Sequence, residues 1–372
     1  MVSEDPIYKE LRKKIDESMP IGFPASDDGT ELRLLEMLFT PEEAKIAINL
    51  GMLPESLKVI HRRVSKAGIS ISLNEMEQIL DGLVEKGAII GGGILDDEKQ
   101  AKRYSLVQWI LGMWELQVDN LTKEFAELAE RYSLETFYQE LHRKDRPCQM
   151  RTIPVERSLT VEHGVSTYDN IREVIENTVD SIAVMNCICR QEHDLIEKPC
   201  KLSDIRRNCI SFNNFAEIVV KIVPSARRIS KDELLKLLDT YQREGFVIQT
   251  ENNQNPQYMC FCCGCCCGFL TTAKQFPRPT EYYSSNFYAQ TNKELCNGCE
   301  TCLKRCQMEA ITMVDGKSRV NLDKCIGCGN CVATCESNAK FLIKRDEEII
   351  PAKDQMELYQ KIMEKKIKYL EH

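Results

Sequence analysis

The chain has 372 residues, of which 43% are hydrophobic and 28% are charged, and these values exclude an intrinsically disordered chain. This length favours two or three domains over a single hydrophobic core. The net charge of -8 provides no overall attraction to nucleic acid or to an anionic membrane surface.

Cysteine is the component that departs most from an ordinary composition. The sequence contains 19 cysteines, an odd number that cannot all pair in disulfides. No apolar signal stretch follows Met1, and the longest uncharged apolar run, residues 258–270, is too short to span a bilayer. We therefore expect a cytoplasmic protein without a membrane span, whose reduced thiols are available as metal ligands.

The front of the chain predicts a small helical module. Residues 1–29 are expected to form an N-terminal extension with a short helix, and residues 30–118 have apolar residues at helical spacing. The last predicted elements of this part are helices over 57–66 and 73–86, followed by a hairpin of residues 88–95 and 103–107. This order of elements resembles that of a winged-helix domain.

The remaining chain is expected to complete a multidomain α+β protein. Residues 119–180 are interpreted as a helical connector that ends in a helix over 169–181. Residues 181–281 are interpreted as a cysteine-rich α/β domain, in which Ser230-Lys-Asp-Glu233 predicts the start of a helix. The last two parts are residues 282–345, with two cysteine runs, and residues 346–372, which have the amphipathic pattern of a C-terminal helix.

Two cysteine runs repeat each other at an interval of 29 residues. Residues 296–306 read Cys-Asn-Gly-Cys-Glu-Thr-Cys-Leu-Lys-Arg-Cys, and residues 325–335 read Cys-Ile-Gly-Cys-Gly-Asn-Cys-Val-Ala-Thr-Cys. Thiolates are the soft ligands that iron–sulfur clusters require, and the glycines permit tight turns around a cluster. This duplication resembles the bacterial two-cluster [4Fe-4S] ferredoxin.

The resemblance implies two [4Fe-4S] clusters in which each run lends its last cysteine to the other cluster. The ligands of one cluster would be Cys296, Cys299, Cys302 and Cys335. The ligands of the other would be Cys325, Cys328, Cys331 and Cys306. The family usually has Pro after the fourth cysteine of each run, whereas Gln307 and Glu336 follow here. A pair of zinc sites is the alternative, but the doubled pattern favours iron–sulfur clusters.

Removing these eight cysteines from the 19 leaves eleven, and ten of these lie in two dense groups. Cys148 stands alone and is interpreted as a small buried apolar residue. We predict at least one additional metal centre in the middle domain, with an iron–sulfur cluster favoured over zinc. The first predicted ligand set is Cys187, Cys189, Cys200 and Cys209. We expect Cys187 and Cys189 to lie on an extended segment, where residues two positions apart point to the same side. The second set is drawn from Cys260, Cys262, Cys263, Cys265, Cys266 and Cys267.

The whole arrangement resembles the multidomain 4Fe-4S ferredoxin family of anaerobes. In that family a winged-helix-like front, a Cys-x-Cys-Arg segment, a Cys-Cys-x-Cys-Cys-Cys segment and a two-cluster ferredoxin occur in this order. The resemblance implies a cofactor class but no defined reaction. The two predicted clusters favour an electron carrier that passes single electrons between a protein donor and a protein acceptor. Such a carrier would be a subunit or dedicated partner of an anaerobic redox enzyme, in a larger complex or as a homo-oligomer.

Two other functions stay open from the sequence. A redox-responsive transcription regulator would use the winged helix on DNA, and an oxidoreductase would use a catalytic metal centre in the middle domain. The predicted recognition helix disfavours DNA, because Glu75, Glu77, Asp81 and Glu85 oppose a single Lys86. His193 is interpreted as a lone exposed histidine, and no catalytic residue is predicted, so an electron carrier is favoured over a stand-alone enzyme.

Overall fold

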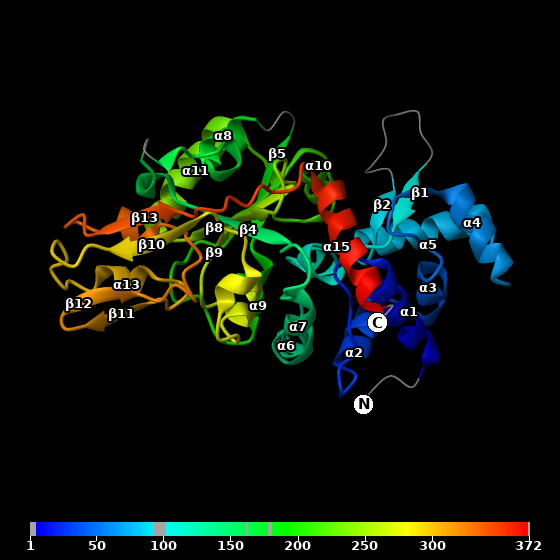
Figure 1. The fold of residues 1–372 in the computed structure, drawn as a ribbon. Helices are drawn as coiled ribbons and strands as arrows, with labels where there is room; N and C mark the ends of the chain where they lie inside the picture. The colour runs from blue at the N-terminus through cyan, green and yellow to red at the C-terminus, as the bar shows by residue number, and fades with distance from the viewer. Residues whose placement is uncertain (1–4, 93–101, 161–162, 178–180, 371–372) are drawn as a thin grey trace. The chain divides into compact units, whose positions relative to one another are not determined.

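The computed structural model describes residues 5–92, 102–160, 163–177 and 181–370. The chain is a mixture of helices and strands and divides into two compact units (Figure 1). The first unit consists of Met1–Leu141, Asn186–Lys198 and Glu217–Ala226. The second unit consists of His142–Met185, Pro199–Ala216 and Arg227–His372.

The first unit begins with a run of helices followed by a small sheet. Thr40 and Ser72 each close a capping box, which explains where two of these helices start. The helices are α1 (Pro6–Ser18), α2 (Thr30–Leu38), α3 (Pro41–Ala47), α4 (Leu57–Lys66) and α5 (Leu73–Glu85). Strands β1 (Glu55–Ser56), β2 (Ile90–Gly92) and β3 (Arg103–Ser105) form an antiparallel sheet in the order β1-β3-β2. Predicted residues 93–95 of the hairpin lie outside the described residues.

An aromatic core and one aspartate hold the rest of the first unit together. Trp109 contacts the rings of Phe23, Trp114, Phe125 and Tyr132. Asp119 accepts hydrogen bonds from Asn186 Nδ2 at 2.9 Å and from the Ser225 amide at 2.8 Å, which attaches two distant segments of the chain. The helices here are α6 (Lys123–Tyr132), α7 (Tyr138–Leu141) and α9 (Ile188–Leu195), while α10 (Asn213–Ile222) extends across the boundary between the units.

The second unit is built on a six-stranded sheet in the order β4-β8-β9-β6-β5-β7. Its strands are β4 (Met150–Ile153), β5 (Ile182–Asn186), β6 (Arg207–Phe212), β7 (Arg227–Arg228), β8 (Val247–Glu251) and β9 (Tyr258–Cys262). One face, which includes Ile210, Ile248 and Phe261, shares a core with residues of α8 (Ile171–Glu176) and α11 (Lys231–Glu244). Ser230 caps α11 as predicted, but the helix predicted over 169–181 ends at Glu176.

The segment with the two cysteine runs packs against the other face of this sheet. Val247 and Cys262 of the sheet belong to the same core as Phe287 and Ile326. The pairs β10 (Phe287–Thr291) with β13 (Lys340–Lys344) and β11 (Ile311–Val314) with β12 (Lys317–Val320) are antiparallel. Three short helices accompany them: α12 (Gly268–Ala273), α13 (Thr301–Arg305) and α14 (Asn330–Ala333).

The chain ends in α15 (Gln355–Leu370), which belongs to the second unit. Gln355 Nε2 at its first turn donates to Glu251 Oε1 at 2.7 Å, and burial raises the pKa of Glu251 to about 7. Of the helices in the described ranges, none has both the length and the apolar character needed to cross a membrane.

Candidate metal centres

The eight cysteines of the two runs surround two hollows in the second unit. One hollow, of about 300 Å³, is lined by Cys296, Cys299, Cys302 and Cys335. The other, of about 380 Å³, is lined by Cys306, Cys325, Cys328 and Cys331. Each hollow therefore combines three cysteines of one run with the last cysteine of the other run.

Glycine is required at the tight turns that shape both hollows. Gly298 has a φ of +74°, and a Cβ there would lie 2.5 Å from the carbonyl oxygen of Gly316. Gly327 has a φ of +69°, and a Cβ there would lie 2.2 Å from the carbonyl oxygen of Phe287. A side chain at either position would combine an unfavourable backbone conformation with a clash against the backbone that encloses the hollow.

Backbone amides of neighbouring strands donate hydrogen bonds to the thiols. The amides of Ser318 and Ala289 lie 3.5 and 3.3 Å from the sulfur atoms of Cys296 and Cys325, respectively. The Ala310 amide lies 3.2 Å from Cys306 Sγ. Such bonds stabilise negative charge on sulfur, and they are among the factors that set cluster potentials.

The eight thiols of the two runs differ in their exposure to solvent. Cys299 is exposed, and Leu295 and Leu303 close to it in the chain are 52% and 38% exposed. In the other hollow, burial raises the pKa of Cys328 to about 12 and raises that of Cys331 as well. Cys299 is accordingly the most accessible of these eight thiols.

The middle cysteines divide between the two faces of the sheet because successive side chains of strand β9 point to opposite faces. Cys260 and Cys262 are two positions apart and point to one face, whereas Phe261 points to the other. After the strand, Cys263 and Cys266 join the core that contains Phe261, while Cys267 joins the core that contains Cys262. Six cysteines that are nearly adjacent in sequence thus contribute to two separate groups.

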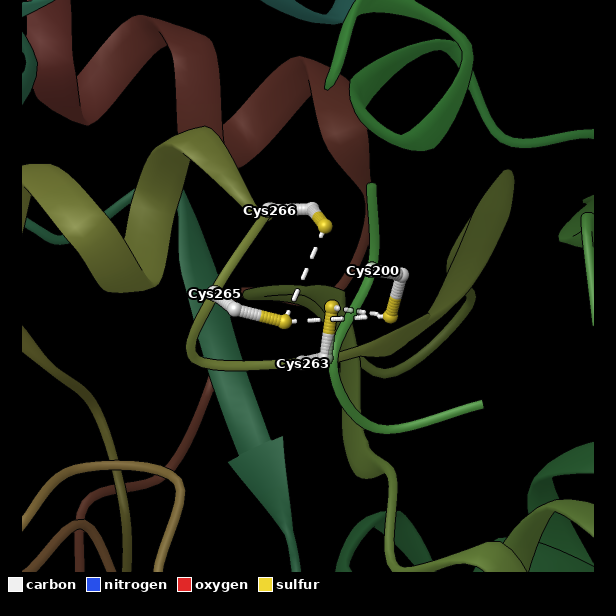
Figure 2. Close-up of side chains that lie close together, drawn as sticks. All are labelled: Cys200, Cys263, Cys265 and Cys266. Carbon is white, nitrogen blue, oxygen red and sulfur yellow. Dashed lines mark hydrogen bonds between the residues drawn. The ribbon is translucent and has the colours of Figure 1, made fainter. Parts of the chain in front are cut away.

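The first group brings four thiols together from two segments (Figure 2). Cys263, Cys265 and Cys266 lie in the turn after β9, and Cys200 comes from the loop before β6. The sulfur of Cys200 lies 3.6 Å from that of Cys263 and 3.7 Å from that of Cys265, and the sulfurs of Cys265 and Cys266 are also 3.7 Å apart. All four sulfur atoms lie within 4.8 Å of one another. Among the residues that the structure describes, no other group of potential metal ligands lies this close together.

These four thiols, which we call the Cys200 group, form a donor set suited to a soft metal. The sulfur distances are far longer than the roughly 2.05 Å of a disulfide bond, so these are separate thiols. Hydrogen bonds with Cys263, Cys265 and Cys266 lower the pKa of the Cys200 thiol. The backbone amide of Lys201 also donates to Cys265 Sγ at 3.4 Å. Thiolates in this arrangement favour zinc, iron or an iron–sulfur centre over hard cations.

The second group, which we call the Cys260 group, lies on the opposite face of the sheet. Cys209 of β6 is directly opposite Cys260 in the register of the two strands. Hydrogen bonds link Cys260 to both Cys209 and Cys262, and another links Cys262 to Cys267. Cys260, Cys262 and Cys267 of this connected set pack in the same core as Phe287 and other residues around the larger hollow.

Comparison with known proteins adds one finding for the C-terminal region. A family model described as the 4Fe-4S dicluster domain matches residues 289–336, which include all eight cysteines that line the two hollows. This part of the chain is a ferredoxin-type domain. A comparison with curated proteins found no match. The ferredoxin-type domain and the Cys200 group support iron–sulfur electron transfer in general and suggest metal sites beyond the dicluster domain.

The structure corrects the predicted grouping of the middle cysteines. Cys200 and Cys209, expected in one ligand set with Cys187 and Cys189, belong instead to the Cys200 group and the Cys260 group. The extended segment predicted at Cys187 and Cys189 is also wrong, because Cys187 caps helix α9 and Cys189 lies in its first turn. Alternation along a strand therefore does not apply to this pair. Both belong to the first unit, whereas Cys200 and Cys209 belong to the second.

His193, in the same helix, is not the exposed histidine that the sequence predicted. Its side chain is only 12% exposed, and Nδ1 donates a hydrogen bond to the carbonyl oxygen of Cys189 at 3.0 Å. The ring also lies 3.7 Å from a carboxylate oxygen of the buried Glu192. The sequence interpretation missed this burial because it did not anticipate which face of α9 is covered.

Gln307 joins the ferredoxin-type domain to the loop of the Cys200 group. Its side-chain Oε1 accepts a hydrogen bond from the Gly264 amide at 2.8 Å. Lys274 Nζ donates to the Gly264 carbonyl at 2.9 Å, which holds the same loop from another side. Gln307 directly follows Cys306 and occupies the position at which related ferredoxins usually have Pro. A proline side chain could not accept this bond, so the structure gives a reason for the departure.

Gly264→Ala is expected to lower the melting temperature of the metal-loaded protein by roughly 5 °C. A Cβ at this position would lie 2.0 Å from the carbonyl oxygen of Gln307, so one of the two backbone segments must move. Gly268→Ala is the matched control, because a Cβ there meets nothing within 4 Å. Thermal unfolding of both variants under anaerobic conditions checks the prediction, and equal melting temperatures would contradict it.

Proposed function

We propose that the chain is an iron–sulfur electron-transfer protein that passes single electrons between a protein donor and a protein acceptor. It would act in the reducing cytoplasm as a subunit or dedicated partner of an anaerobic redox enzyme. One observation carries the proposal: eight cysteines form two separate four-thiol hollows within the segment that matches the dicluster domain. Each hollow supplies four thiolates, which is the ligand number of a [4Fe-4S] cluster.

The exposure of Cys299 supports a route for electron exchange. Cys299 lies close in the chain to Leu295 and Leu303, two exposed apolar side chains suited to docking a partner. The other hollow is lined by Cys306, which precedes Gln307, and the side chain of Gln307 reaches the loop of the Cys200 group. Electrons would therefore enter or leave at the cluster near Cys299 and be relayed inward through the second cluster.

The front module is proposed to be a winged helix that docks a protein rather than DNA. The order α3, β1, α4, α5, β2, β3 and the sheet order β1-β3-β2 support the winged-helix assignment. On α5, Glu77 and Asp81 form ion pairs with Lys102 at 2.8 and 2.6 Å, so the charge of this lysine is neutralised within the module. On α4, Arg63 pairs with Glu55 at 2.6 Å. An acidic α5 would repel the phosphates of a duplex.

The middle cysteines are proposed to hold additional metal. The Cys200 group is one centre, and the Cys260 group supplies ligands for a second. Cys187 and Cys189 stay predicted ligands at the start of α9. Buried cysteines also serve as small apolar residues, but that role does not require four sulfurs from two segments to converge.

Anaerobic purification followed by iron and acid-labile sulfide analysis tests the proposed function. We expect about eight sulfides per chain or more, and reduced protein with the EPR signals of [4Fe-4S] clusters. A redox titration should then show one-electron steps, and electrons should pass to an external acceptor protein. Protein reconstituted anaerobically with iron and sulfide that still carries no acid-labile sulfide would refute the proposal.

A further inference from the structure

We propose that the Cys200 group holds a single tetrahedrally coordinated metal ion, iron or zinc, and not an iron–sulfur cluster. The inference depends on the proposed function only in that it assigns the [4Fe-4S] clusters to the ferredoxin-type domain. It defines the third metal centre of the chain, which the proposed function leaves chemically open.

The sulfur distances carry this inference. Four thiolates around an ion with metal–sulfur bonds of about 2.3 Å form a tetrahedron whose edges are about 3.8 Å long. The structure has three edges of 3.6, 3.7 and 3.7 Å, and the other three are also shorter than 4.8 Å. The three edges of 3.6, 3.7 and 3.7 Å agree with the ideal tetrahedron to within about 0.2 Å.

A cubane cluster requires a different spacing. Each of its thiolates binds a different iron at a different corner of the cube, so the sulfur atoms must lie outside the cluster core and well apart. The ferredoxin-type domain has this wider geometry: its eight thiols line two hollows, four thiols to each. Within the described part of the chain, its cysteines form no set whose sulfur atoms all lie within 4.8 Å.

The surroundings of the Cys200 group favour a closed site. Cys263 and Cys266 are buried in the core that includes Ile248 and Phe261, and Cys200 and Cys265 are half-buried. Four thiolates fill all four positions of a tetrahedral ion, which leaves none for substrate. A closed set of four thiolates is typical of structural zinc sites and of single-iron electron carriers. The ion would connect the loop before β6 to the turn after β9, which are otherwise distant in sequence. Zinc would stabilise this connection, and iron would also carry one electron.

Comparing the wild-type protein with Cys265→Ala and Cys148→Ala tests the inference. Cys148 is the control, because it is half-buried and belongs to neither thiol group. Anaerobically prepared Cys265→Ala should lose about one iron or zinc ion per chain and no acid-labile sulfide, while Cys148→Ala should lose neither. Loss of about four irons together with four sulfides would overturn the inference, and so would no loss of metal.

A measurement on wild-type protein covers the case in which Cys265→Ala fails to fold. If zinc is bound, zinc-edge X-ray absorption should show four sulfur neighbours and no metal neighbour. If iron is bound, the oxidised protein should show the EPR signal of an isolated high-spin ferric ion. Absence of both signatures would overturn the inference. Lack of any acid-labile sulfide would instead refute the proposed function and leave the single-ion site untouched.

Discussion

The double variant Cys306→Ala/Cys325→Ala is expected to lose one [4Fe-4S] cluster, although its two substitutions fall in different cysteine runs. Both residues line the larger hollow, so both substitutions remove ligands of the same cluster. Cys306→Ala/Cys302→Ala, with both substitutions in the first run, should instead lose both clusters, because Cys302 lines the other hollow. EPR spin counting on the reduced proteins gives the number of clusters per chain.

This pair of double variants separates crossed ligation from simple ligation within each run. If each run held its own cluster, the outcomes would be reversed: Cys306→Ala/Cys325→Ala would lose both clusters, and Cys306→Ala/Cys302→Ala would lose one. Cys148→Ala should keep both clusters and serves as the control for replacing a cysteine that lines neither hollow. The expected effect is large. Under crossed ligation, Cys306→Ala/Cys325→Ala leaves one cluster with two of its four thiolate ligands, and Cys306→Ala/Cys302→Ala leaves each cluster with three.

Asp169→Ala is expected to destabilise the second unit by about 3 to 5 kcal/mol. Asp169 and Arg151 form an ion pair in which both side chains are nearly inaccessible, with exposures of 0% and 1%. Asn286 Nδ2 also donates to Asp169 at 2.7 Å, which links the ion pair to the segment just before the residues that match the dicluster domain. Removing the carboxylate would leave a buried guanidinium without its counter-charge, and burial already lowers the pKa of Arg151.

Asp239→Ala is the matched control for this prediction. Asp239 also pairs with an arginine, Arg172, at 3.2 Å, but its side chain is 59% exposed. Exposed pairs contribute roughly 0 to 1 kcal/mol, so this variant should unfold close to the wild-type temperature. Thermal unfolding of the two variants under the same anaerobic conditions checks the contrast. Similar melting temperatures would show that the buried pair does not make the larger contribution.

The sequence by itself determined the elements that depend on local chemistry. The helix predicted over 57–66 is confirmed as α4, and the cap predicted at Ser230 is confirmed at the start of α11. The doubled cysteine spacing likewise predicted a ferredoxin-type domain, which the match over residues 289–336 supports. These features are set by residues within a few positions of one another, through helical periodicity, capping and short ligand spacing.

Only the tertiary structure decided which of the middle cysteines belong together. Cys200 and Cys263 are 63 residues apart, and their sulfurs meet because the sheet places the loop before β6 beside the turn after β9. The register of β6 and β9 puts Cys209 opposite Cys260, and so in a different thiol group from Cys200. Sequence spacing indicates that thiols can bind metal, but strand pairing and the alternation of faces determine which thiols share a centre.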